Sequence, residues 1–193
     1  MIVTHSKCSG SQVVRLSEDE ARLLMQTDGQ TTDSVSAFAT LLSLPEGDRP
    51  LLWVSFHVDV STASESGDQV SMITQSRLKA GWELVTQLDT DPTARPTDVR
   101  CQFTPQVPVD PSTGLVTGQL VMTVGGSLLA DIEDMQLAEQ WLTGVRRRGE
   151  FALYLGPLNV HRWTNGLDVD AIERTVRAGQ LVGCLAELEF TTG

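Results

Sequence analysis

The side chains most able to do chemistry are few and scattered along this chain. Ser55, His57 and Asp59 are the residue types of a hydrolase triad, in which the His takes the proton of the Ser and the Asp orients the His. Apolar residues alternate with them, so all three belong to the polar face of one strand. Positions two apart on a strand have Cα atoms about 6–7 Å apart, which separates the three side chains. We therefore predict a polar strand surface here, not a triad.

The motifs of common enzyme families do not occur in the sequence. There is no GxGxxG, GxxxxGK[ST], GxSxG or HExxH pattern. Cys8, Cys101 and Cys184 form no CxxC pair, which argues against a zinc or redox site. Cys101 and Cys184 lie in alternating apolar segments and are expected to be buried free thiols. We expect no catalytic residues, no metal and no cofactor.

Charged residues gather at three places where helices are predicted to begin or end. The acids fall at helix starts, where they stabilise free amides; a calcium site shared between subunits is the alternative. The basic run falls at a helix end, where cations are favoured; the alternative is a phosphate contact on RNA or DNA, with Arg162 added. The acidic groups are Asp131, Glu133 and Asp134, and Asp168 and Asp170; the basic run is Arg146, Arg147 and Arg148.

The composition is that of a folded, acidic protein. Apolar residues make up 40% of the 193 residues, and the formal net charge is −11. This charge argues against coating nucleic acid by bulk attraction and against adhesion to anionic membranes. No apolar run approaches the roughly 20 residues that span a bilayer. The opening "MIVTHSKCSG" lacks an apolar secretory segment, so we expect an intracellular location.

Hydrophobic periodicity predicts a mainly β protein. From Leu52 to Val60 every even position is apolar, which predicts a half-buried strand at about 51–61 with even-numbered side chains inward. Further strands are expected from residue 69, around 99–103, 120–124 and 151–155, and as one long strand at about 180–191. Helices are expected at about 18–27, 75–88 and 132–146, and from Val169 to Gly179.

These elements favour a single domain over residues 1–193. Residues 1–30 would form an N-terminal arm with a short helix, and 31–193 an antiparallel β-sandwich of the jelly-roll type, with helices inserted in its connections. The alternative is an α+β sheet with helices on one face. The apolar residues Trp53 and Tyr154 fall where a lone sandwich would point polar side chains outward, so we expect them, together with His57 of the polar strand face, at a subunit interface.

Two segments resemble the coat proteins of small icosahedral plus-strand RNA viruses of plants, with the tymovirus group as the nearest. The first is "TTDSVSAFATLLSL", a short turn and "LLWVSFHVDVSTASESGDQVSM"; the second is the closing "AGQLVGCLAELEFTTG". The resemblance implies a jelly-roll subunit that assembles into a shell around viral RNA and is located in the virion. The length of the chain and the lack of a long basic N-terminal arm in its sequence also fit the tymovirus group.

Two other functions stay open. One is a non-enzymatic α+β binding domain from a GC-rich bacterium or phage, located in the cytoplasm. Twelve arginines against two lysines fit that source. The other is an enzyme without a recognisable motif.

Overall fold

The computed structural model of the chain describes residues 2–5, 13–15, 35–44, 47–56, 58–63, 69–106, 109–158 and 169–191. The helix expected at 18–27 lies outside these residues. Two short strands fall in the expected N-terminal arm, and the division into an arm and a sandwich stays a prediction.

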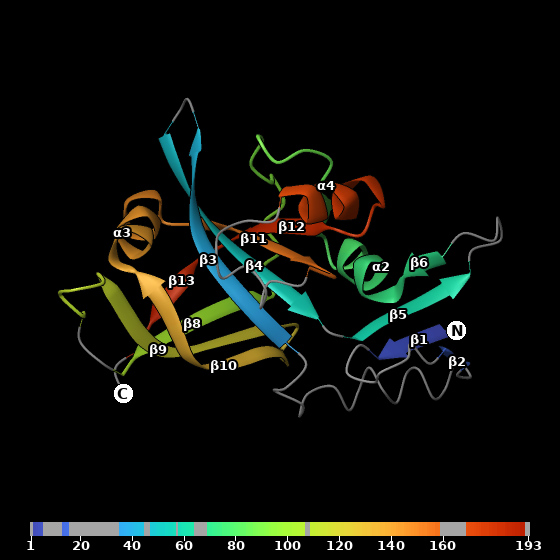
Figure 1. Ribbon diagram of the computed structural model, residues 1–193, viewed down its shortest axis with the longest axis horizontal. Coiled ribbons are helices and arrows are strands. Elements are labelled where there is room, and N and C mark those ends of the chain that lie inside the picture. The colour runs from blue at the N-terminus through green and yellow to red at the C-terminus, as the bar shows by residue number, and fades with distance from the viewer. Residues whose placement is uncertain are drawn as a thin grey trace.

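A five-stranded sheet forms the centre of the molecule (Figure 1). Its order is β3 (Val35–Leu44), β4 (Gly47–Phe56), β11 (Phe151–Gly156), β12 (Val182–Ala186) and β7 (Glu83–Leu84). β3 and β4 form a hairpin whose ladder is unbroken from Val35–Phe56 to Leu44–Gly47. β4 and β11 are parallel, and the other pairs are antiparallel.

A four-stranded sheet lies below it in the view of Figure 1. Its order is β10 (Ser127–Ala138), β9 (Leu115–Val124), β8 (Val99–Pro105) and β13 (Leu188–Phe190). β8 and β13 are parallel, whereas β8–β9 and β9–β10 are antiparallel. A third, antiparallel sheet has the order β2 (Val13–Arg15), β1 (Ile2–His5), β5 (Val58–Ala63) and β6 (Gln69–Ser71).

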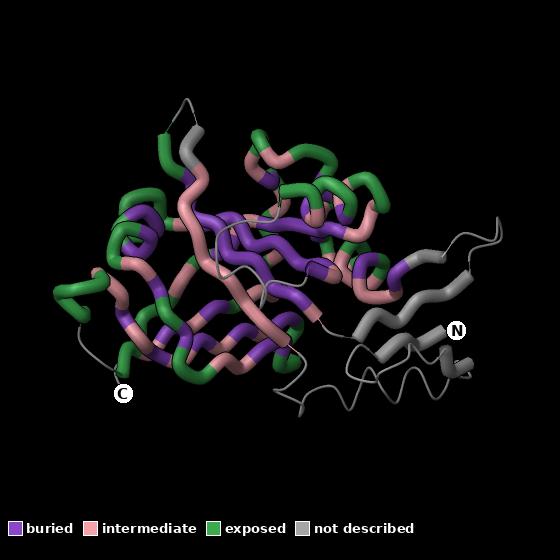
Figure 2. Tube along the Cα trace, viewed as in Figure 1, coloured by how far each residue is buried: buried purple, intermediate pink, exposed green. Residues whose placement is uncertain are grey.

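The main core lies between the two larger sheets, where the buried segments of Figure 2 converge. Leu52 and Val54 of β4 and Cys101 and Phe103 of β8 are each 0% exposed. Alternate residues of β9 point into this core, as its regular alternation of buried and half-buried positions shows. The predicted inward register is therefore confirmed for Leu52 and Val54.

The opposite face of the five-stranded sheet carries a second core. Leu51 and Trp53 of β4 pack there with Tyr154 of β11 and with Ile172 of helix α4 (Val169–Arg177). β4 is thus buried on both faces, as in strands that are covered by layers on each side. The prediction of a half-buried strand is wrong for this reason.

The helices are shorter than the sequence predicts. α2 (Met72–Lys79) begins after Ser71, whose Oγ accepts a 3.3 Å hydrogen bond from the amide of Thr74. It ends early because Gly81 has φ +86°, a conformation that interrupts helices. α3 (Glu139–Arg148) begins seven residues after its predicted start, since residues 127–138 form β10. The helix predicted from Val169 is confirmed as α4.

The mainly β prediction is confirmed, but the all-antiparallel arrangement is wrong for two pairs. β11 reaches β4, and β13 reaches β8, after long connections that allow parallel pairing. The single strand predicted at 180–191 is split at Glu187: β12 belongs to the five-stranded sheet and β13 to the four-stranded one. Phe190, expected inside, is 40% exposed. None of the described helices is long and apolar enough to cross a membrane.

Candidate functional site

Trp53 and Tyr154, expected at a subunit interface, lie inside the chain. They are 1% and 0% exposed, and their rings meet edge to face with centroids 4.8 Å apart. Burial raises the pKa of the Tyr154 phenol to about 12, although the nearby Arg49 guanidinium opposes the shift. Neither side chain is on the surface of this chain, so their expected interface role does not agree with the structure. The side chain of His57 lies outside the described residues.

Of the residues considered for a hydrolase triad, the structure describes the side chain of Ser55 alone. Ser55 is 1% exposed on β4, between two covered faces. The side chains of His57 and Asp59 lie outside the described part of the chain. The predicted polar strand surface is therefore wrong at Ser55, because the sheet is covered on both sides.

Arg49, which the sequence analysis did not single out, is the most deeply buried of the charged side chains that the structure describes. It is 2% exposed and forms an ion pair with Asp91. Its Nη1 and Nη2 groups donate hydrogen bonds of 3.2 and 3.4 Å to the carbonyl oxygens of Leu88 and Asp89. Arg148 contacts the same Asp91 carboxylate at 3.1 Å. The two arginines thus hold the 88–91 loop against β4 and α3, which is a structural task.

The basic run lies in the last turn of α3, as predicted. Gly149 ends the helix in a left-handed conformation, and its amide donates to the carbonyl oxygen of Val145 at 2.8 Å. The guanidinium of Arg146 lies 4.7 Å from the centroid of the Phe190 ring. Arg147 lines a groove of about 440 Å³ between α3 and the β3–β4 hairpin. Cations here stabilise the helix end; an RNA contact stays a prediction, and Arg162 lies outside the described residues.

The acidic residues singled out in the sequence lie on two different elements, strand β10 and helix α4. Asp131, Glu133 and Asp134 lie on β10, so their predicted role at a helix start is wrong. Asp131 accepts a 2.7 Å hydrogen bond from the Gln119 amide. Asp170 lies in the first turn of α4, as predicted, and Asp168 is outside the described residues. Among the side chains that the structure describes, no three metal-ligating groups come together.

Cys101 and Cys184 are buried free thiols, as predicted. Both are 0% exposed in the main core. Burial raises the pKa of Cys101 to about 12, and it raises that of Cys184 as well. A thiol that stays protonated is a poor nucleophile, so neither cysteine is a reactive group. Cys8 lies outside the described residues.

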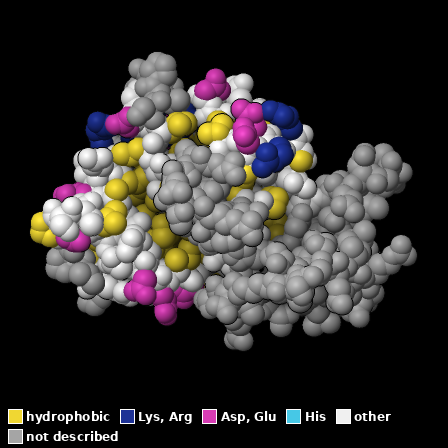
Figure 3. All heavy atoms as spheres, viewed as in Figure 1, with side chains coloured by type: hydrophobic (Ala, Val, Ile, Leu, Met, Phe, Trp, Pro, Cys, Tyr) yellow, Lys and Arg dark blue, Asp and Glu magenta, His cyan; other side chains and the backbone are white. Residues whose placement is uncertain are grey.

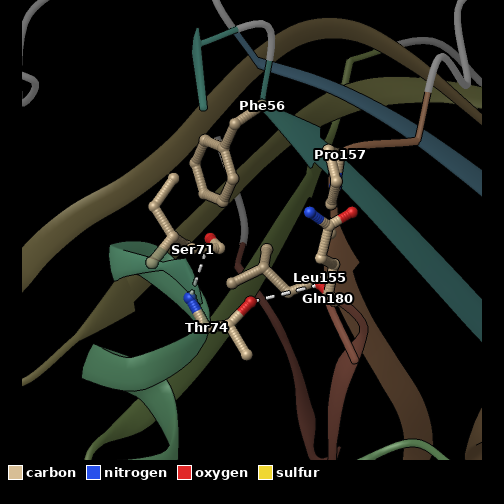
Figure 4. Close-up of a pocket in the computed structure, with 8 residues that line it drawn as sticks. Phe56, Ser71, Thr74, Leu155, Pro157 and Gln180 are labelled. Carbon is tan, nitrogen blue, oxygen red and sulfur yellow. Dashed lines mark hydrogen bonds between the residues drawn. The ribbon is translucent and has the colours of Figure 1, made fainter. Parts of the chain in front are cut away.

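A small apolar cavity lies where α2, β4 and β11 meet (Figure 4). Phe56, Ile73 and Leu155 supply its apolar walls, and the Thr74 hydroxyl at its edge donates a 3.2 Å hydrogen bond to the Gln180 carbonyl oxygen. It has room for about one water molecule, far less than a small-molecule site needs.

A groove of about 320 Å³, larger than this cavity, lies beside the residues that join β12 to β13. The main charges that line it are paired with one another. Arg95 binds Glu150 through two hydrogen bonds of 2.9 and 3.1 Å, and Arg100 lies 3.7 Å from Glu189. These two pairs are each neutral, and the carboxylate of Glu187, which also lines the groove, leaves it with a single negative charge.

The outer edge of β3 differs from the other described edges of the two large sheets. β3 is a ten-residue strand without a charged or proline residue, and β4 is its only ladder partner among the described strands. Its eight residues with described side chains, 35–42, are all half-buried. Hydrophobic side chains gather along the diagonal that β3 follows, and acidic and basic ones lie around them (Figure 3). We call this feature the β3 edge.

Unpaired edges of long, uncharged strands are the places where sheets take up another strand. The β3 edge is therefore our candidate functional site, one that supports binding of a strand but no chemical reaction. The signal was present in the sequence as "VSAFATLLSL". Its position at the edge was not, because it depends on which strands pair with β4.

Family models, curated proteins and solved structures provide no match to this chain.

Proposed function

We propose that this chain is a non-enzymatic structural subunit that associates with copies of itself and builds a closed shell of the viral-coat type. The observation that carries the proposal is the β3 edge, ten uncharged residues that end a sheet without a further described partner. Such an edge favours association through main-chain hydrogen bonds. The resemblance of the 31–72 segment to plant-virus coats supports the same function.

The chemistry of the described residues supports a structural function as well. The buried thiols are held protonated, the buried Arg49 is committed to a loop, and the apolar cavity beside α2 has room for about one water molecule. In this proposal two packed, partly parallel sheets take the place of the jelly roll. The subunit would be located in a virion.

The charge of the chain sets the conditions for assembly. At a net charge of −11, subunits repel one another at low salt, and this repulsion is screened beyond about 8 Å at physiological salt. Assembly is therefore expected to strengthen with added salt or mild acid. RNA binding would have the opposite salt dependence, since counterions compete for phosphate.

Size-exclusion chromatography with light scattering, followed by electron microscopy, tests the function directly. We expect particles far larger than a dimer at moderate salt, with RNA supplied. A protein that never exceeds a small oligomer at any salt concentration contradicts the shell and favours the alternative, a domain that binds an extended peptide.

The RNA contact has its own test at Arg147, the member of the basic run that lines the groove beside α3. The substitution Arg147→Gln should lower the slope of log affinity against log salt by about 0.7 if this side chain contacts one phosphate of single-stranded RNA. Arg174→Gln, an exposed site on α4, is the matched control. Equal slopes for both variants and the unmodified protein would remove Arg147 from the contact.

A further inference from the structure

We propose that residues 88–95 form an acid-released strap: they detach from the five-stranded sheet when their carboxylate anchors take up protons, while both large sheets stay folded. We call these residues the strap. They lie in the connection from β7 to β8, residues 85–98, which contains neither helix nor strand. Connections of this length without secondary structure are uncommon in compact domains and often move or bind a ligand. Release of the strap does not depend on assembly into a shell.

The strap covers the part of the β12 edge that lies beyond β7. β7 pairs with β12 at Val182 and Gly183. Farther along β12, the amide of Leu185 donates a 2.8 Å hydrogen bond to the carbonyl oxygen of Ala94 in the strap. Leu88 of the strap packs at the margin of the second core. Release of the strap therefore uncovers the outer edge of β12 beyond Gly183 and one side of the second core.

The centre of the strap is held by one carboxylate between two arginines. Asp91 forms ion pairs with Arg49 of β4 and with Arg148 of α3, and it also interacts electrostatically with Tyr154 of β11. Arg49 keeps its charge at all pH values of interest, and it is 2% exposed. If Asp91 takes up a proton, this buried guanidinium loses its counter-charge, which is costly. Opening relieves that cost, because the strap also supplies the two carbonyl oxygens that bind Arg49.

The end of the strap near residue 95 is held by two further carboxylates. Glu83 of β7 accepts hydrogen bonds of 2.8 Å from both the amide and the hydroxyl group of Thr93. Glu150, between α3 and β11, forms an ion pair with Arg95. All three side-chain anchors are therefore carboxylates, which take up protons in the same range of acid pH. The other ionisable groups near these two anchors are the Tyr154 phenol and the Cys184 thiol beside Glu83, and Arg100, Glu187 and Glu189 in the groove beside Glu150.

Proton uptake acts on the strap before it acts on the sheets. The closed strap holds its carboxylate anchors ionised and binds fewer protons than the open strap, so lower pH favours opening. The described residues of the main core are apolar, and main-chain hydrogen bonds join its strands. These contacts do not depend on carboxylate charge. We therefore expect the strap to open as a separate unit, which makes it a pH-sensitive switch.

Hydrogen exchange followed by NMR tests the release in the unmodified protein, from neutral pH to about pH 4, with rates corrected for the intrinsic effect of pH. We expect the protection of the Leu185 amide to fall about tenfold or more, while the amides of β9 keep theirs. Loss of protection at both places together would overturn the proposal, because the strap would then open only when the whole chain unfolds. Unchanged protection at Leu185 would overturn it as well.

The substitution Asp91→Asn should open the strap without acid. At neutral pH it should lower the protection of the Leu185 amide about tenfold or more. Asp131→Asn is the matched control, because Asp131 is also a half-buried carboxylate that accepts a hydrogen bond, but from Gln119 in the other large sheet. This control should leave Leu185 protected. Full protection of Leu185 in Asp91→Asn would contradict the anchor, and the measurement on the unmodified protein decides the release if this variant does not fold.

Discussion

Gly183 of β12 lies directly opposite Tyr154 of β11, and the tyrosine ring covers the space that a side chain at residue 183 would occupy. A methyl group at this position would lie 2.7 Å from the nearest ring carbon and 3.0 Å from Val85. The absence of a side chain at Gly183 therefore sets the position of Tyr154 in the second core.

The substitution Gly183→Ala should destabilise the protein by about 1–3 kcal/mol, because the ring has to move within a packed core. Chemical denaturation measures the loss. In a Tyr154→Leu background the same substitution should cost much less, since the ring atoms that clash are gone. Equal costs in both backgrounds would contradict the contact.

Tyr154 should make stability fall at alkaline pH. Burial raises its pKa to about 12 from the ordinary value of 10.0, so the folded state holds the phenolic proton more tightly than the unfolded state. Its contribution is fully present below about pH 10 and is lost as the pH rises through 12, at about 1.4 kcal/mol for each unit of difference in pKa.

The chain has one tyrosine, so phenolate absorbance reports this side chain alone. We expect an apparent pKa near 12 in the folded protein and near 10 in denaturant. The Tyr154→Phe variant should lose part of the alkaline dependence of stability; the Cys101 thiol, whose pKa is also raised to about 12, should supply some of the remainder. A folded-state pKa near 10 would contradict the burial of the phenol.

Two buried tryptophans should respond differently to removal of their indole N–H groups. The Nε1 group of Trp141 donates a 2.9 Å hydrogen bond to the carbonyl oxygen of Leu51, which joins α3 to β4. Trp141→Phe leaves that oxygen without its donor and should cost about 1–3 kcal/mol beyond the lost packing. The Nε1 group of Trp82 is buried without a hydrogen-bond partner in the described structure, so Trp82→Phe is the control and should cost less. Similar losses from denaturant titrations would argue against the Trp141 bond.

Asp91 should matter more than a surface carboxylate because its partner Arg49 is buried. Asp91→Asn leaves the guanidinium without its counter-charge, which we expect to cost up to about 3 kcal/mol. Glu150→Gln breaks the more exposed pair with Arg95 and should cost less, because water screens exposed ion pairs. Thermal unfolding of the two variants compares them, and a larger effect at Glu150 would contradict the role of Asp91 in holding the loop.

The alternation of apolar and polar residues was sufficient to predict the strands that bury every second side chain on one face. The alternation of Cys101 with Phe103, and of Leu120 with Met122 and Val124, predicted β8 and β9 because one face of each is buried. It failed for β10, whose two register shifts break the period of two. The apolar residues that follow recur at the spacing of a helix. For this reason the helix was predicted to start at residue 132, seven residues before α3 begins.

The burial of both faces of β4 could not be predicted from the sequence, for a different reason. Trp53 interrupts the polar side of its strand, a pattern that fits either an interface or a second core. The parallel neighbour β11 and the covering helix α4 decide between these, and both come from distant parts of the chain. The β3 edge was missed in the same way, because the order of strands in a sheet is a property of the whole fold.

The parallel pairing of β4 with β11 also has a consequence during synthesis on the ribosome. Leu51 of β4 pairs with Ala152 of β11, so this strand pairing cannot form until residue 152 has been synthesised. At the usual ~5–20 residues per second, the β3–β4 hairpin therefore emerges roughly 5–20 s before the strand that covers it. During that interval both edges of the hairpin are open, including the uncharged strand β3. On a polysome, neighbouring nascent chains would meet through this hairpin, so premature contact between unfinished copies is the hazard that chaperones would have to suppress.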